Sequence, residues 1–183
     1  MTILMLKKPF LILAIVLFCM SPGIFANEAV TPSKARGAVI EQVIGEIANF
    51  NTFRISSKSL ELIFSKHCKQ INTSKDQDAV FQSYHCEDHT GIQMIDMISM
   101  EPQGGQNHLL ELKIKFSYNS YPLVHKVVMG NLGKPSRKMA DFIEWRNTRD
   151  SSLNKLGNPV INISRNKVKG SGRLIFALEQ GDN

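Results

Sequence analysis

This chain of 183 residues lacks the features that mark several common classes of protein. No run of Lys or Arg exceeds two residues, whereas nucleic-acid-binding domains usually carry longer basic clusters. The catalytic motifs Gly-x-Ser-x-Gly and His-Glu-x-x-His are absent, as is the phosphate-binding loop. The apolar run from Phe10 to Met20 is shorter than the ~20 residues that a membrane-spanning helix needs. We therefore expect no nucleic-acid partner, no enzyme and no stable membrane span after export.

What is present at the N-terminus has the pattern of a secretory signal peptide. Lys7 and Lys8 precede the apolar run, residues 21–23 (Ser-Pro-Gly) break it, and Ala26 offers a small residue for cleavage. This pattern predicts a signal peptide at residues 1–26 and an exported protein, periplasmic or secreted. An uncleaved anchor is the alternative, because the third residue before the cleavage point is aliphatic rather than small.

Cysteine is scarce, and its placement is informative. Of three cysteines, Cys19 lies in the signal segment, and Cys68 and Cys86 remain in the exported part. An even number of cysteines in an exported chain favours a disulfide, which would contribute about 3 kcal/mol by closing a short loop. Two buried free thiols are the alternative. The chain holds 22 Lys and Arg against 16 Asp and Glu, and the signal segment removes two lysines, so the exported charge of +4 is mild.

Hydrophobic spacing predicts three helices behind a flexible arm at residues 27–34. Apolar residues at steps of three and four from Val39 to Phe50 indicate a leading amphipathic helix. A second helix is expected to begin at Ser56 or Ser57 and to carry His67 and Cys68 on its inner side, before a polar loop at residues 72–78. The third is expected over Tyr121–Leu132, with Pro122 in its first turn, Gly133 as its cap and Pro135 beyond.

Each of the last two helices is followed by three segments with the composition of β-strands. Alternation and β-branched content predict these strands at residues 79–87, 92–100, 108–117, 142–147, 158–165 and 172–179. The order helix, strand, strand, strand thus occurs twice, in halves 56–117 and 120–180 of one α+β domain at residues 35–183. We expect one antiparallel sheet of six strands, with the helices on one face and the other face open, behind an extra N-terminal helix.

The second half of the chain resembles a known family of envelope domains. Val127, the run Leu132-Gly133-Lys134-Pro135 and Trp145 form a helix-stop-then-aromatic-strand signature. This signature is similar to that of the β-lactamase-inhibitory-protein-like and SmpA-like envelope domains, over residues 121–179. The resemblance implies tandem helix-plus-sheet units. It also implies that a concave sheet face grips a target protein.

The open sheet face is the predicted binding surface. If Trp145, Leu174 and Phe176 point toward the helices, the residues that alternate with them point outward. The candidates for contact with another protein are Lys113, Lys115, Glu144, Arg146, Arg173 and Ile175. Trp145 is assigned to the core, with a role as an interface anchor as the alternative.

A metal site is a weaker candidate. On a continuing strand, His85, Glu87 and His89 would share one face, with the spacing of metal ligands. The alternative is a solvated strand end. His67 beside Cys68 could tune a reactive thiol, but an oxidising compartment favours a closed bridge. We therefore predict no cofactor and no metal.

The sequence predicts an exported, non-enzymatic protein-binding module, such as an inhibitor or immunity-type protein that covers a partner's functional surface. One alternative is an envelope maintenance or assembly module that binds lipid, peptide or an assembly complex in an apolar groove beside the leading helix. A small periplasmic metal-binding protein is a second.

Overall fold

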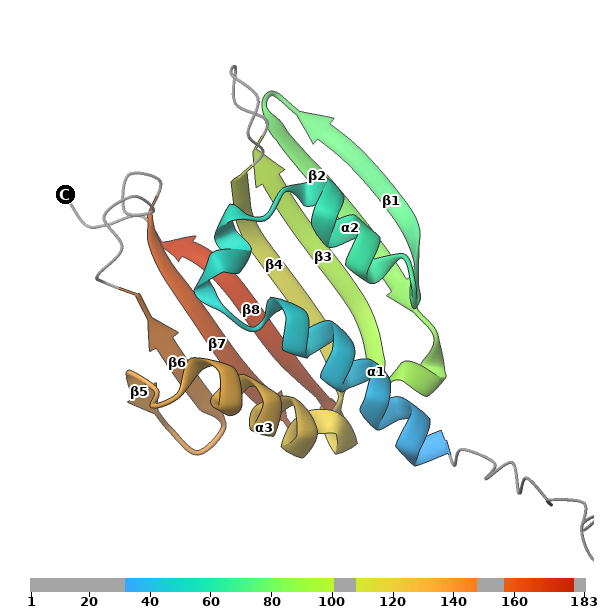
Figure 1. Cartoon of the computed structure of the whole chain (residues 1–183), viewed down its shortest axis with the longest axis vertical. Coiled ribbons are helices and arrows are strands. Elements are labelled where there is room, and N and C mark those ends of the chain that lie inside the picture. Colours follow the sequence, from blue (N-terminus) through green and yellow to red (C-terminus); the bar gives the residue numbers. More distant parts are fainter. Residues whose placement is uncertain (1–31, 101–107, 148–156, 180–183) are drawn as a thin grey trace, which may run out of the picture. The chain divides into compact units, whose positions relative to one another are not determined.

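The computed structural model describes residues 32–100, 108–147 and 157–179 (Figure 1). The predicted signal peptide at residues 1–26 and the arm as far as residue 31 lie outside this part of the chain. Thr31–Asn183 forms one compact unit. Among the described residues, no helix has the length and apolar character needed to cross a membrane.

One antiparallel sheet forms the body of the molecule. Its strand order is β1-β2-β3-β4-β8-β7-β6-β5, so β4 and β8 pair at the centre. The strands are β1 (Cys68–Asp76), β2 (Ala79–Cys86), β3 (Ile92–Met100), β4 (His108–Ser117), β5 (Arg137–Lys138), β6 (Phe142–Arg146), β7 (Asn158–Asn166) and β8 (Ser171–Glu179). The α+β class with an antiparallel sheet is therefore confirmed.

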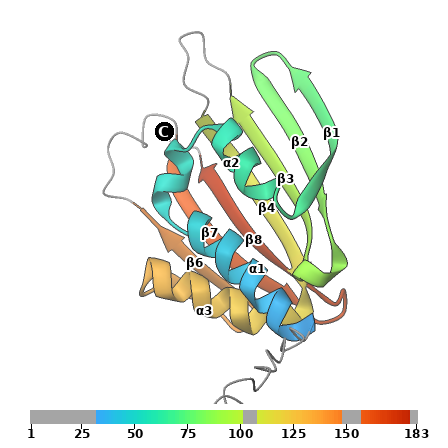
Figure 2. The ribbon, with the colours of Figure 1, turned by 45° about the vertical axis from the view of Figure 1, so that its right-hand side comes forward.

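The α-helices of the described residues lie on the same side of this sheet, as Figures 1 and 2 both show. They are α1 (Pro32–Ile47), α2 (Ser57–Phe64) and α3 (Tyr121–Leu132). Short 3-10 helices, η2 (Phe50–Arg54), η3 (Asp88–Thr90) and η4 (Tyr118–Ser120), join the elements. The helix α1 begins at Pro32, inside the segment predicted as part of the arm. Asn131 of α3 donates a hydrogen bond from Nδ2 to the carbonyl oxygen of Gly45 at 2.9 Å, which ties α3 to α1.

Over the part of the chain that the structure describes, the sheet has eight strands rather than the six predicted. The polar segment expected as a loop at residues 72–78 belongs mainly to β1, which pairs with β2 from Cys68 to Asp76. The second helix accordingly ends at Phe64, so His67 and Cys68 are not on its inner side. Edge strand β1 is exposed along most of its length, so it needs no apolar alternation, and its composition resembles that of a loop. The other missed strand, β5, has two residues.

The segment from α3 to β6 explains how the chain stops a helix and starts a strand. Gly133 adopts φ +70°, a conformation that a side chain disfavours, and its N–H donates to the carbonyl oxygen of Met129 at 2.9 Å. Trp145 is 2% exposed and donates from Nε1 to the carbonyl oxygen of Gly133 at 3.0 Å. The assignment of Trp145 to the core is correct, and its indole locks the end of α3 onto β6.

The core lies between the helices and the sheet. Apolar residues from the inner sides of the strands are buried against α1, α2 and η2. The largest fully buried side chains include Phe53 of η2, Phe64 of α2, and Tyr84, Phe116 and Phe176 of the strands. The rings of Phe53 and Phe176 meet edge to face with centroids 6.2 Å apart. The predicted bridge between Cys68 and Cys86 is present, and it joins β1 to β2 at one end of their ladder.

Candidate functional site

The side of the sheet away from the helices, here called the open face, carries no helix within the described residues. Cross-strand pairing arranges its side chains in rows that run from β2 to β6. The upper row is Phe81, Ile98, Glu111, Ala177, Val160 and Arg146. The middle row is Ser83, Asp96, Lys113, Ile175, Asn162 and Glu144. The lower row is His85, Met94, Lys115, Arg173, Ser164 and Phe142.

All six predicted partner-binding residues lie on this face. Lys113 is directly opposite Ile175, and Lys115 is directly opposite Arg173 across the central β4–β8 pair. Lys113, Lys115, Arg146 and Arg173 are exposed. Glu144 differs from the expectation of an exposed contact residue, because it is only 7% exposed. Any part that Glu144 takes in binding is therefore indirect.

Several charged side chains of the open face form ion pairs with one another. Arg146 donates from Nε to Glu144 Oε1 at 2.6 Å and from a terminal nitrogen to Glu179 Oε2 at 2.8 Å. The hydrogen bond to Glu144 raises the pKa of Arg146 further above its usual value. The amine of Lys113 lies 2.6 Å from Glu111 Oε1. The charges of these residues are therefore largely balanced within the face.

The lower row is different, because its cations have no acidic partner in the part of the chain that the structure describes. Lys115 and Arg173 are adjacent by register, and their row neighbours Met94 and Ser164 carry no charge. By register, the first carboxylate on this face lies one row away, on Asp96, which faces Lys113 and accepts a hydrogen bond from Ser83 Oγ at 2.7 Å. Lys115 and Arg173 are therefore free to attract an anionic group.

Apolar side chains on β2 and β3 lie in two of these rows: Met94 borders Lys115 in the lower row, and Phe81 and Ile98 belong to the upper row. Phe81 is 37% exposed and pairs with Ile98, and Met94 stands beside Lys115. Exposed aromatic residues, Met and Arg are enriched at protein interfaces. The three apolar residues follow the alternation of strands that the sequence predicts, but they were not selected from the sequence as binding residues.

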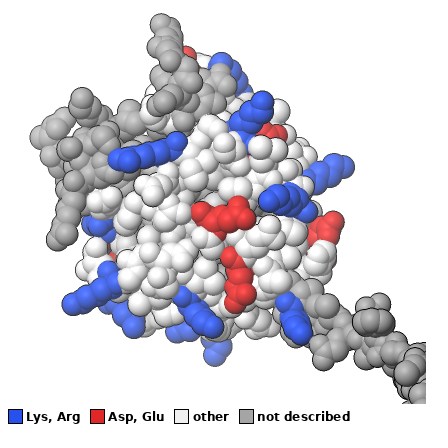
Figure 3. Space-filling view, viewed as in Figure 1, with Lys and Arg blue, Asp and Glu red and all other residues white. Residues whose placement is uncertain are grey.

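The helix-covered side has a different charge pattern. Figure 3 shows acidic side chains near the middle of this side, over α1, with Lys and Arg toward the rim. Glu41 and Glu46 of α1 are both exposed. An acidic partner would therefore be attracted to the open face rather than to the centre of the helix side.

The three candidate metal ligands do not lie on one continuing strand. Strand β2 ends at Cys86, Glu87 follows as a cap, and His89 lies in η3, so His85, Glu87 and His89 do not share a strand face. Glu87 Oε2 and His89 Nδ1 form an exposed pair at 3.1 Å, and His85 faces the open side opposite Met94. Within the described residues, no group of three metal-ligating side chains is present.

The surroundings of the disulfide form a second concave region. A pocket of about 580 Å³ is lined by residues that include His67, Cys68, Lys69, His85 and Glu87. Both sulfur atoms are bonded to each other, so the alternatives of a reactive thiol beside His67 and of two free thiols are wrong. The Nε2 atom of His67 is buried without a hydrogen-bond partner. Without a free thiol, this pocket offers no nucleophile from its cysteines.

Comparison of the chain with protein-family models, with curated proteins and with solved structures gives no match. The resemblance of residues 121–179 to β-lactamase-inhibitory-protein-like envelope domains therefore stays a prediction.

Proposed function

We propose that this chain is an exported, non-enzymatic module that binds another protein through the open face. It would block that partner's functional surface, as an inhibitor or an immunity-type protein does. The observation that carries the proposal is the lower row at Met94, Lys115 and Arg173. There, an apolar side chain stands next to two cations that no described carboxylate neutralises.

The chemistry of this row defines the partner. Lys115 and Arg173 call for a carboxylate cluster on the partner, and Arg173 is suited to bidentate pairing with one carboxylate. Met94 would contact an apolar group next to those carboxylates, and Phe81 and Ile98 in the upper row would contact a second apolar part of the partner. The proposed partner is thus a folded protein whose functional surface combines acidic and apolar residues.

The rigidity of the sheet supports binding by a preformed surface. Residues on paired strands lose little conformational freedom when a partner docks, so less of the interaction energy is spent on ordering. The bridge between Cys68 and Cys86 ties β1 to its neighbour. The ion pairs of Arg146 with Glu144 and Glu179 hold the far side of the face in one arrangement.

We also propose that the domain is a tandem of two helix-and-sheet units and that the protein lies in an oxidising compartment. The helix α2 precedes β1–β4, α3 precedes β5–β8, and the sheet order places the two sets in mirrored sequence about the β4–β8 pair. This arrangement supports a tandem of two helix-and-sheet units with α1 as an additional helix. The disulfide supports an oxidising compartment such as the periplasm.

The alternative of an envelope module with an apolar groove beside the leading helix gains no support from α1. Ile40, Val43, Ile44 and Ile47 of that helix are each 0–1% exposed, so its apolar stripe is already covered. The alternative of a metal-binding protein loses its spacing argument, since His85, Glu87 and His89 lie on different elements.

Site-specific photo-crosslinking tests the proposed surface. A photoreactive amino acid is placed at Ile98 or Ile175 on the open face, and at Leu62 or Lys126 on the helix side as a matched control. After irradiation in an envelope extract of the source cells, mass spectrometry identifies the attached protein.

We expect both open-face positions to capture the same acidic protein and both helix-side positions to capture none of it. The reversal Lys115→Glu should remove the product at Ile98 and Ile175. Capture of one protein mainly from Leu62 and Lys126 would place the binding surface on the helices and would refute the proposal.

A further inference from the structure

A pocket at the end of the β7–β8 hairpin has the composition of an anion site. It measures about 160 Å³ and is lined by Ser164, Arg165, Asn166, Lys169, Ser171 and Arg173. The turn between the strands contains Gly170 at φ +59°, a conformation that favours glycine, and brings Lys169 back toward β8. No carboxylate is among the lining residues.

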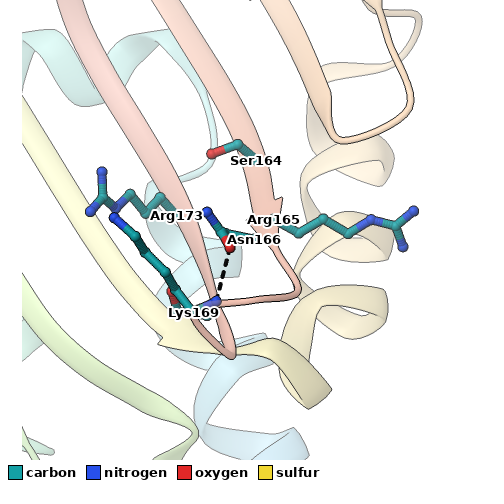
Figure 4. A pocket seen from close by; sticks show the side chains of 6 residues that line it. Ser164, Arg165, Asn166, Lys169 and Arg173 are labelled. Atoms are coloured by element: carbon teal, nitrogen blue, oxygen red, sulfur yellow. Dashed lines mark hydrogen bonds between the residues drawn. The ribbon is translucent and has the colours of Figure 1, made fainter.

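The side chains of the pocket converge on one side of the hairpin. Figure 4 shows Arg173 and Lys169, which both line the pocket, extending in the same direction, while Arg165 points the opposite way. Arg165 is engaged there, because its Nε donates to Asp141 Oδ1 at 2.8 Å and its guanidinium stacks over the ring of Tyr121. Two cations, Arg173 and Lys169, thus serve the pocket.

Asn166 adds neutral donors at a fixed orientation. Its Oδ1 accepts a hydrogen bond from the backbone N–H of Lys169 at 2.9 Å, drawn as the dashed line in Figure 4. This bond fixes the amide, and the NH₂ end, with two donors, points away from the backbone N–H of Lys169. The hydroxyl groups of Ser164 and Ser171 add further donors to the lining.

Like charges that line one pocket repel each other, and an anion bound between them removes this repulsion. No described carboxylate pairs with Arg173, Lys169 or Lys115, and Lys115 is directly opposite Arg173 in the sheet. Nearby, Ser117 pairs with Ser171, so this end of the β4–β8 ladder also lacks acids. The excess positive charge is thus concentrated at the hairpin end.

We propose that this pocket binds a phosphate group. A phosphate monoester carries close to two negative charges at neutral pH and has several acceptor oxygens. The pocket offers two converging cations, a third on the neighbouring strand and neutral donors from Asn166 and the serines. A carboxylate, with a single charge and two oxygens, would use only part of this set. The site shares Arg173 and Lys115 with the proposed protein-binding surface, and its test below uses no protein partner.

The source of the phosphate is either a soluble compound or a lipid headgroup. Val168 at the tip of the turn is 97% exposed between Lys167 and Lys169, which is a suitable contact for an anionic membrane surface. The shared chemistry is the phosphate group, and two arms of one experiment separate the sources.

The first arm is a titration of the whole exported chain with inorganic phosphate, glycerol phosphate and acetate at constant ionic strength, followed by backbone amide NMR. We expect saturable shifts at Lys169, Ser171 and Arg173 with both phosphates. Arg173→Gln and Lys169→Gln should each weaken binding by at least about tenfold, as expected for the loss of a hydrogen bond to a charged group. Lys113→Gln, with the same change of net charge on the same face, is the matched control.

The second arm measures sedimentation with vesicles of phosphatidylglycerol and phosphatidylcholine, compared with vesicles of phosphatidylcholine alone. Binding to the anionic vesicles that Val168→Ser and Arg173→Gln both reduce assigns the phosphate to a lipid headgroup. Saturable binding in the first arm without vesicle binding assigns it to a soluble compound.

Absence of saturable phosphate shifts together with absence of vesicle binding would overturn the proposal. The phosphate assignment would also fail if acetate bound as tightly as phosphate, or if Lys113→Gln weakened binding as much as Arg173→Gln. Amide spectra of each variant in the absence of ligand show whether it is folded, so loss of binding is distinguishable from loss of structure.

Discussion

Removal of the Cys68–Cys86 bridge should lower the free energy of unfolding by about 3 kcal/mol. The bridge joins residues 18 apart in sequence. In the chain-entropy model, a loop of this length restricts the unfolded chain by about 11 cal/mol/K, which corresponds to ~3 kcal/mol at 25 °C. For a domain of this size, that loss corresponds to a fall in Tm of about 6–12 °C.

The position of the bridge predicts where the loss is first seen. Edge strand β1 pairs only with β2 in the described sheet and is exposed along most of its length. Apart from the disulfide, few packing contacts therefore hold β1 in place. Amide hydrogen exchange should therefore accelerate in β1 more than in β3 or β4 when the bridge is opened. The opened chain should keep the central strands intact under conditions in which β1 exchanges freely.

Two comparisons distinguish the effect of the cross-link on stability from the effect of the packing of the two cysteine side chains. Urea unfolding of the wild type is compared with and without reductant, because reduction keeps every carbon atom of Cys68 and Cys86. The double substitution Cys68→Ala and Cys86→Ala adds the loss of buried sulfur, since Cys86 is 1% exposed. Equal unfolding midpoints for oxidised and reduced wild type would refute the stabilising role of the bridge.

Three further substitutions test the core and its titration. Gly172→Ala should destabilise the chain by about 1–3 kcal/mol in urea unfolding, because a Cβ there would collide with the ring of buried Phe116; an unchanged midpoint would show that the ring moves freely. Tyr84→Phe should leave stability unchanged or raise it by about 1 kcal/mol, because the hydroxyl is buried without a partner. Burial, with a smaller effect of Glu61, raises the pKa of Tyr84 to about 12, so the substitution should also remove a tyrosine with this raised pKa from an absorbance titration. Burial lowers the pKa of His125 below 6.5, so as pH falls the unfolded chain takes up this proton before the folded chain does. The free energy of unfolding should therefore fall as pH drops from 7 through 6.5. His125→Gln should flatten this part of the curve of stability against pH, and an identical curve would contradict the assignment.

Elements with a strong pattern of their own were predictable from the sequence. The bounds of β3, β4 and α3 agree with the prediction, because clean alternation marks β4 and because Pro122 and Gly133 mark the ends of α3. These signals are local, so they identify an element even when the elements that it packs against are unknown. The cap role of Ser56 is confirmed for the same reason, since its hydroxyl accepts from the N–H of Ser59 at 3.2 Å.

Edge strands were not predictable, because they bury little. The strand β1 carries polar residues on both sides, and β5 has two residues that pair only with β6. In such segments, hydrogen bonding to a neighbouring strand determines the conformation, and no hydrophobic period records it. The sequence therefore underestimated the width of the sheet by two strands.

The sequence predicted which face of the sheet carries the candidate site, but not which of its residues are neighbours. Alternation placed Lys113, Lys115 and Arg173 on the open face, because each neighbours an apolar residue of the core. The adjacency of Lys115 and Arg173 depends on the pairing of β4 with β8, which are more than fifty residues apart. The burial of Glu144 beneath its ion pair with Arg146 likewise depends on contacts between side chains.

The affinity of the captured partner for two matched variants tests the central claim most directly. Ile175→Glu and Leu62→Glu each exchange an apolar side chain for a carboxylate, the first on the open face beside Lys113 and the second on the exposed side of α2, where Leu62 is 62% exposed. Calorimetric titration should show at least about tenfold weaker binding for Ile175→Glu, since an added carboxylate repels an acidic partner, and unchanged binding for Leu62→Glu. Unchanged binding for Ile175→Glu together with weakened binding for Leu62→Glu would contradict the assignment of function to the open face.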